Sequence, residues 1–110
     1  MLPNRMNIFK SSEDQLKRLK QQTGITPNIA ARIAFCHSIE LETISSLEPR
    51  RVDGTLNLDK ATWLGDYTEL YELALVKKYP KLGTKELELA WAIHVENGLN
   101  YLLEEYKKSR

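Results

Sequence analysis

Four cations in the first part of the sequence have side chains suited to phosphate contact: Lys10, Lys17, Arg18 and Lys20. At helical spacing the three lysines share about one third of the circumference, and Arg18 lies further round. Ammonium and guanidinium groups donate charge-assisted hydrogen bonds to phosphate oxygens, and such contacts position DNA without reading its sequence. The pattern predicts contact with a nucleic-acid backbone; the alternative is a solvated helix face.

Two carboxylates weaken this basic cluster. Each precedes a cation at the i,i+4 spacing that favours ion pairs within a helix, as Glu13–Lys17 and Asp14–Arg18. Lys10 and Lys20 have no carboxylate four residues before them. We therefore expect Lys10 and Lys20 to lack a close carboxylate and to be the strongest phosphate contacts.

The other reactive residues form no catalytic or metal-binding pattern. Cys36 shares a helical face with Ile29 and Ile33, so we expect a buried thiol and not a sulfur carrier, which needs an exposed thiolate. His37 and His94 belong to no Cys/His cluster with metal spacing. His94 borders an apolar stripe, which indicates a hydrogen-bonded core residue. We expect neither a metal nor a cofactor.

The carboxylates and glycines do not indicate an enzyme. No set of acids converges as a metal-dependent nuclease requires, and the five glycines are isolated instead of forming a phosphate-binding loop. Arg50 and Arg51 are either further phosphate contacts or a solvated pair on a loop. The Trp and Tyr side chains of the later helices fall at core spacing, so we expect them to pack in the core and not to stack on bases.

Composition indicates a single domain over residues 1–110, with 42% apolar and 28% charged residues. The net charge is +1, but residues 1–35 hold six basic and two acidic side chains, whereas residues 36–110 hold ten and thirteen. This asymmetry predicts one basic surface of modest strength. One cysteine, no apolar run long enough for a membrane and no signal segment lead us to expect a cytoplasmic protein.

The basic cluster requires an element to carry it. Residues 3–9 predict an extended arm or short strand. A helix follows, with Ser11 or Ser12 as its N-cap, and Gly24 suits the left-handed residue that ends it. Pro27 then opens a second helix.

The second helix, from Pro27 to about Glu42, is apolar almost all round, and its three alanines allow close approach of another helix. Such a helix must be buried, and in a chain of 110 residues we expect that burial to occur between subunits. Residues 43–58 carry turn signals, among them Asp53-Gly54, which favour a flexible loop over a small hairpin.

Two further helices complete the prediction. The third carries Trp63, Tyr67, Leu70, Tyr71 and Ala74 at helical spacing and ends near Tyr79. Asp66 and Glu69 could form a capping box if this helix starts after Gly65. The fourth runs from Thr84 to about Lys107 and carries Gly98 in its apolar stripe, which indicates close packing against another backbone. The predicted fold is mainly α: a compact domain of about four helices with a short extended N-terminal arm, oligomeric through its apolar second helix.

Three segments resemble a known family: LKRLKQQTGITPNIAARIAFCHSIE, TWLGDYTELYELAL and AIHVENGLNYL. They are similar to the DndE family of the bacterial DNA phosphorothioate modification system, from Met6 to about Leu103, and the TGITPN block is the most specific part. The resemblance implies a helical tetramer that binds duplex DNA, preferably at nicks. Separate partner proteins of the system, including a cysteine desulfurase, an iron–sulfur protein and an ATPase, would insert the sulfur. The resemblance implies no catalytic residue here.

The predicted function is that of a non-catalytic DNA-binding accessory subunit of this system, with Lys10, Lys17, Arg18 and Lys20 on the duplex backbone. Two alternatives remain at this point. One is a ribbon-helix-helix regulator, because residues 3–9, 12–23 and 27–42 have the strand-helix-helix lengths of that fold. The other is an adaptor that joins the modification proteins without touching DNA.

Overall fold

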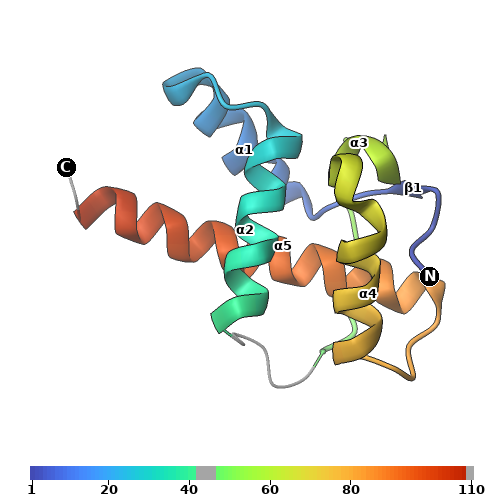
Figure 1. The fold of residues 1–110 in the computed structure, drawn as a ribbon. Helices are drawn as coiled ribbons and strands as arrows, with labels where there is room; N and C mark the ends of the chain where they lie inside the picture. The colour runs from blue at the N-terminus through green and yellow to red at the C-terminus, as the bar shows by residue number, and fades with distance from the viewer. Residues whose placement is uncertain (42–46, 109–110) are drawn as a thin grey trace.

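The computed structural model describes residues 1–41 and 47–108, and this part of the chain is mainly helical (Figure 1). In chain order the elements are β1 (Arg5–Met6), α1 (Lys10–Thr23), α2 (Pro27–Leu41), β2 (Leu58–Asp59), α3 (Lys60–Leu64), the 3-10 helix η1 (Gly65–Tyr67), α4 (Thr68–Lys78) and α5 (Thr84–Lys108). Helices α2 and α4 both lie across the long helix α5, and α1 packs against α2 (Figure 1). The prediction of a mainly helical domain is confirmed.

The first two helices have nearly the predicted bounds. Gly24 ends α1 with a φ of 80°, a left-handed conformation that glycine adopts without strain. Pro27 is the first residue of α2, as predicted. The start of α1 differs: the helix begins at Lys10 without a serine cap, and the carboxylate of Asp53, far along the chain, accepts the Lys10 N–H at 2.9 Å.

The predicted third helix is divided into α3, η1 and α4. Gly65 has a φ of 67° and interrupts the helix after α3. The capping box of Asp66 and Glu69 was a wrong prediction, because α4 begins at Thr68 and has no side-chain cap. An interaction from α2 stabilises the break, since the Arg32 Nε donates to the Trp63 carbonyl at 2.7 Å at the end of α3.

The main core lies between α2 and α5. Gly98 on α5 faces the backbone of Ala34 on α2, and a Cβ at this position would overlap the Ala34 carbonyl. The predicted role of Gly98 in close backbone approach is confirmed. Beside this contact, the ring centroid of Phe35 lies 5.0 Å from that of Trp91, and Trp91 in turn packs edge-on against Trp63. Both tryptophans are fully buried, as the core prediction requires.

The N-terminal arm is a strand that pairs within its own chain. β1 runs antiparallel to β2, with Arg5 opposite Asp59 and Met6 opposite Leu58. The Trp63 Nε1 donates to the Met6 carbonyl at 2.8 Å, which holds the arm against α3. The arm thereby brings the start of α1 against the segment that precedes α3.

Helix α2 has two different apolar faces. One, which includes Ala31 and Phe35, is buried within the chain. The other carries Ile29 and Ile33, which remain 45% and 49% exposed. The prediction that Cys36 is buried is wrong for the single chain: Cys36 is exposed on this second face. The wheel pattern alone could not tell which apolar face the rest of the chain would cover.

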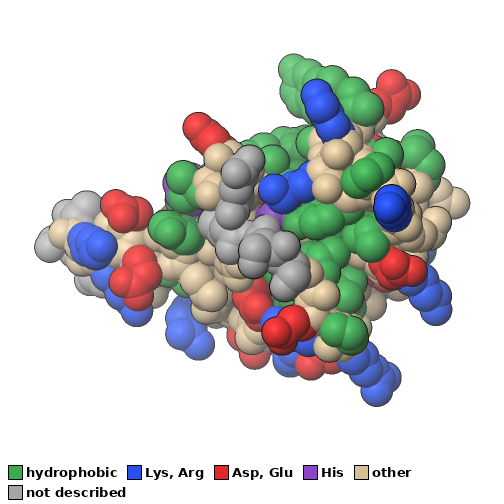
Figure 2. Space-filling view, turned by 90° about the horizontal axis from the view of Figure 1, so that it is seen from below, with side chains coloured by type: hydrophobic (Ala, Val, Ile, Leu, Met, Phe, Trp, Pro, Cys, Tyr) green, Lys and Arg blue, Asp and Glu red, His purple; other side chains and the backbone are tan. Residues whose placement is uncertain are grey.

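An apolar groove continues from this face of α2 to α4. It has a volume of about 510 Å³ and is lined by Ile29, Arg32, Ile33, Cys36, His37, Glu40, Leu64, Tyr67 and Tyr71. Leu70 and Leu73 extend the exposed apolar surface along α4, where they are 62% and 61% exposed. In Figure 2, hydrophobic side chains gather at the upper edge, on the side where α2 and α4 lie.

His94 is a buried polar link between three helical segments. Its Nδ1 lies 2.8 Å from Ser38 Oγ on α2, and its Nε2 lies 2.8 Å from the Tyr79 hydroxyl at the end of α4. The prediction of a hydrogen-bonded core histidine is confirmed. Burial, together with the nearby charge of Lys78, lowers the pKa of His94 from 6.5 to about 4.

We expect His94 to weaken the fold in mild acid. Because the folded chain holds His94 neutral while the unfolded chain protonates near pH 6.5, stability is full above that pH. It falls as the pH drops from 6.5 towards 4, by about 3 kcal/mol in all. The measurement is the free energy of unfolding in urea across this range. A His94→Gln variant should show a smaller decline, and an equal decline in both proteins would contradict the assignment.

Candidate nucleic-acid interface

The predicted phosphate-binding residues all lie on α1, and all four are exposed. Lys10 and Lys17 nevertheless have acidic partners. The Lys17 Nζ lies 3.1 Å from Glu13 Oε1, which confirms the predicted i,i+4 pair. The Lys10 Nζ lies 3.2 Å from Asp14 Oδ1 and 3.6 Å from Glu13 Oε1. The expectation that Lys10 lacks a close carboxylate is therefore wrong.

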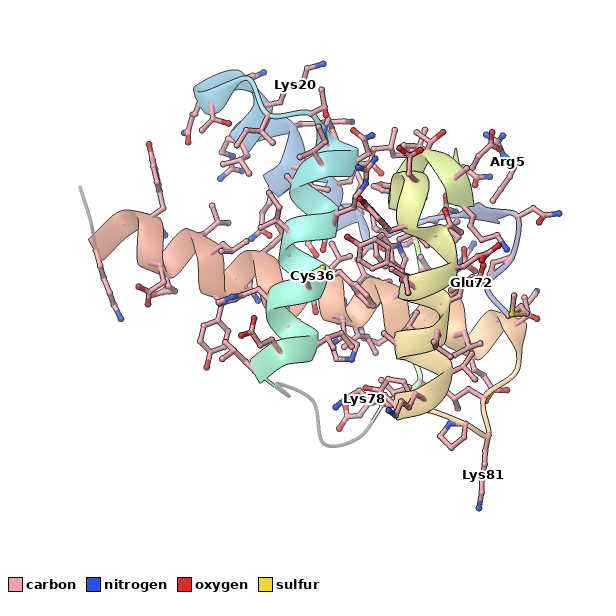
Figure 3. All side chains as sticks on the ribbon, in the orientation of Figure 1. Arg5, Lys20, Cys36, Glu72, Lys78 and Lys81 are labelled. Carbon is pink, nitrogen blue, oxygen red and sulfur yellow. The ribbon has the colours of Figure 1, made fainter. Side chains whose placement is uncertain are left out.

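Arg18 and Lys20 carry the less compensated charge of α1. The predicted pair of Asp14 with Arg18 is absent from the ion pairs of residues 1–41 and 47–108, because Asp14 pairs with Lys10. Neither Arg18 nor Lys20 lies within ion-pair distance of a described carboxylate, and Figure 3 shows Lys20 projecting away from the body of the protein. Arg18 and Lys20 are therefore the stronger candidates for phosphate contact on α1, and Lys10 is a weaker one than the sequence predicted.

Glu13 connects α1 to the segment that precedes β2. Its carboxylate is fully buried and accepts the backbone N–H of Thr55 at 2.7 Å and of Leu56 at 3.0 Å. The Thr55 hydroxyl donates to the same carboxylate at 2.8 Å. The Gly54 N–H also bonds the Ile8 carbonyl at 2.9 Å. The part of the predicted flexible loop that the structure describes is therefore anchored to α1 around Asp53–Leu56.

The hydrogen bonds of Glu13 decide its ionisation. Burial by itself raises the pKa of a carboxyl group, but donors from Thr55, Lys17 and Leu56 outweigh burial and lower the pKa of Glu13 to about 2. A buried, charged carboxylate holds Lys17 and Lys10 at fixed positions on α1. The i,i+4 rule identified only the Lys17 contact, since Thr55 lies 42 residues away in sequence.

Arg50 and Arg51, the other candidate phosphate contacts, have different environments in the structure. Arg50 forms a bidentate ion pair with Glu96 on α5, at 2.6 and 3.1 Å, and its guanidinium lies 3.7 Å from the centroid of the Phe9 ring. Glu96 therefore compensates the charge of Arg50. Arg51 is exposed to solvent.

The remaining candidate residues do not assemble a catalytic centre. Cys36 is exposed, and its Sγ lies 3.5 Å from the Tyr71 hydroxyl in the groove between α2 and α4. The ring of His37 packs edge-on against Tyr101 on α5. Across the described residues, no three His, Cys, Asp or Glu side chains are close enough to hold a metal ion.

Three tyrosines depart from the predicted core packing. Tyr67 is 65% exposed, Tyr101 47% and Tyr106 42%, so the core prediction holds for the tryptophans and is wrong for these three side chains. None of the helices within the described ranges is both long and apolar enough to span a membrane.

Comparison with known proteins identifies the family. The model of the family described as "DNA sulphur modification protein DndE" matches residues 5–110. The chain belongs to the DndE family. No curated protein matches the chain.

Two solved DndE structures have this fold and clear sequence similarity. DndE from Escherichia coli B7A, described as involved in DNA phosphorothioation modification, is 56% identical, with a TM-score of 0.87. A DndE mutant carrying two glycine-to-lysine changes, also described as involved in DNA phosphorothioation, is 53% identical, with a TM-score of 0.85. Each match covers 93% of this chain and 99% of the other.

Proposed function

We propose that this DndE-family chain is a non-catalytic accessory subunit of DNA phosphorothioate modification that binds the backbone of duplex DNA. The observation that carries the proposal is the exposed basic face of α1, with Lys10, Lys17, Arg18 and Lys20, in a chain of the DNA sulphur modification family. Side chains of this kind bind phosphates without reading bases. The partners are duplex DNA and the other phosphorothioation proteins.

The subunit is proposed to act as a homo-oligomer, with a tetramer favoured. Four large apolar side chains are exposed on α2 and α4, namely Ile29, Ile33, Leu70 and Leu73. A monomer usually exposes such residues singly, and a group of them indicates an interaction surface. A second copy offers an equally apolar surface and would also cover Cys36. Repetition of α1 around such an assembly would turn a weak basic surface into a strong one.

A preference for nicked duplex follows from shape. A basic surface built from several subunits favours DNA that bends to follow it, and a break in one strand lowers the elastic cost of bending. Base reading is not part of the proposal. β1 already pairs with β2 of the same chain, and the Met6 carbonyl also accepts the Trp63 Nε1–H, which disfavours the two-copy ribbon of a ribbon-helix-helix regulator.

The proposal is tested by binding of the purified chain to nicked and intact duplexes of equal length, at about 50 and about 200 mM salt. We expect tighter binding to the nicked duplex and a steep fall in affinity with salt. A double variant, Arg18→Gln with Lys20→Gln, removes two positive charges. It should reduce the slope of log affinity against log salt by about 0.9 for each phosphate that it no longer neutralises. The charge-retaining pair Arg18→Lys and Lys20→Arg is the matched control.

Mass in solution is measured with the same samples, and we expect a multiple of the 12.7 kDa chain. Equal affinity for the nicked and intact duplexes would overturn the proposed preference. An oligomer without salt-dependent DNA binding would support instead the adaptor function. A monomer that binds DNA would leave backbone contact standing and remove the assembly.

A further inference from the structure

A second basic surface lies where α4 turns into α5. Residues 73–85 contain four lysines and no Asp or Glu. Lys77 and Lys78 end α4, Lys81 lies in the turn, and Lys85 lies in the first turn of α5. We call this set the turn lysines.

The turn lysines differ from Lys10 and Lys17 of α1 in having no ion-pair partner among the residues that the structure describes. Among the described residues, Lys10, Lys17 and Lys60 form ion pairs. No ion pair of these residues includes a turn lysine: Lys77, Lys78, Lys81 or Lys85. The nearest carboxylate before the stretch, that of Glu72, is buried and bound to Lys60. Lys77, Lys81 and Lys85 are exposed. The first carboxylate after the stretch, that of Glu86, lies beside Gly83 in the same turn but forms no ion pair with these lysines.

Helix stability does not account for all of these charges. Lys77 and Lys78 suit the C-terminus of α4, where cations are stabilised by the helix dipole. Lys85 has the opposite placement, because the first turn of a helix disfavours a cation, and Lys81 is in neither helix. Two of the four lysines therefore have no structural role that their location explains.

The turn that carries these lysines is held in one shape. Tyr79 caps α4 through its N–H, which bonds the Leu75 carbonyl at 2.8 Å, and its hydroxyl bonds His94 in the core. Pro80 fixes the backbone immediately before Lys81. Leu82 packs against the main core. The positions of the lysine backbones are thus preorganised, which reduces the entropy lost on binding.

The composition of this surface favours phosphate over a protein partner. Protein interfaces are centred on apolar groups and are depleted in lysine. Within residues 73–85 the one large apolar side chain that is exposed is Leu73, which lies at the α4 end of the stretch and belongs to the apolar surface of α2 and α4. A set of unpaired ammonium groups without an apolar centre matches instead the phosphodiester backbone of nucleic acid, whose affinity comes from neutralised charge.

We propose that the turn lysines form a second phosphate-contact site for duplex DNA, separate from α1; this inference rests on the proposed DNA-binding function. Figure 3 shows Lys20 and Lys81 projecting from opposite ends of the protein, and Lys78 lies on the same side as Lys81. The face seen in Figure 2 is the one towards which Lys81 projects. The two surfaces would therefore contact different segments of DNA, such as the two arms of a bent duplex.

The test is a triple variant, Lys77→Gln, Lys81→Gln and Lys85→Gln, with the matched triple arginine variant as control. Lys78 is left unchanged because it is half-buried near His94. Binding to duplex DNA is measured over a range of salt concentrations for both variants, the α1 variant and the wild type. We expect the glutamine variant to bind more weakly, with a salt slope smaller by about 0.9 for each phosphate left without a lysine partner. The arginine variant should bind as the wild type does.

Each other outcome has a distinct meaning. If the glutamine variant binds as the wild type does while the Arg18 and Lys20 variant is impaired, the second site is overturned and the proposed function stands. If glutamine and arginine variants lose affinity equally, charge is not the cause and the site is also overturned. If the wild type shows no salt-dependent binding to DNA, the proposed function itself fails. Competition by poly-glutamate as effective as that by DNA would replace phosphate with an acidic protein partner and overturn the site as proposed.

Discussion

Replacement of Gly98 by alanine is expected to lower the free energy of unfolding by about 3 kcal/mol or more. The added Cβ would overlap the carbonyl and Cα of Ala34, and these backbone atoms cannot rotate out of the way as a side chain can. Helices α2 and α5 would have to separate along the main core. The helical preference of alanine over glycine, worth at most about 1 kcal/mol, offsets only part of this destabilisation.

Urea unfolding of the variant and wild type at neutral pH measures the effect. The matched control is Gly83→Ala, because a Cβ at Gly83 meets only the Glu86 carboxylate at an ordinary contact distance of 3.6 Å. This control should stay within about 0.5 kcal/mol of the wild type. A Gly98→Ala protein as stable as the control would mean that the two backbones are not in contact.

Replacement of Glu13 by alanine is expected to cost about 3 kcal/mol of stability at neutral pH. The change removes an acceptor buried at 0% exposure and leaves the N–H groups of Thr55 and Leu56 without their partner. It also releases Lys17 from its ion pair. The segment around Asp53–Leu56 should then detach from α1, which hydrogen exchange of the Thr55 and Leu56 amides would report as faster exchange.

The sign of the pH dependence distinguishes this contribution from that of His94. Because the pKa of Glu13 is lowered from 4.5 to about 2, its stabilisation is complete above pH 4.5 and is lost as the pH falls towards 2. The stability difference between wild type and Glu13→Ala should therefore be constant above that pH and narrow below it. Asp14→Asn is the control, since it removes only a half-exposed ion pair with Lys10 that solvent screens, and it should change stability little. A constant difference down to pH 2 would contradict an ionised Glu13.

Features that depend on residues close together in the chain could be predicted from the amino-acid sequence. The helix end at Gly24 and the start at Pro27 follow from backbone preferences of single residues, and the structure has both. The apolar spacing around Gly98 correctly predicted its close contact with another backbone. The same kind of spacing correctly predicted that His94 is a hydrogen-bonded core residue. These signals are local, because a helix repeats every few residues and its ends are set by the residues that form them.

Contacts between distant segments could not be predicted in this way, because they depend on how the whole chain packs. The pairing of Glu13 with Thr55, the cap of Asp53 on α1 and the break of the third helix beside Arg32 each join residues more than 30 positions apart. Likewise, an apolar wheel could not show that the face of α2 with Cys36 would stay open while the opposite face packed on α5. Charge compensation depends on the same packing. Which lysines lack an ion pair could therefore not be predicted from the sequence, because the free charge of a side chain is set by its neighbours in space. Among the described residues, those of the α4–α5 turn are without such a partner.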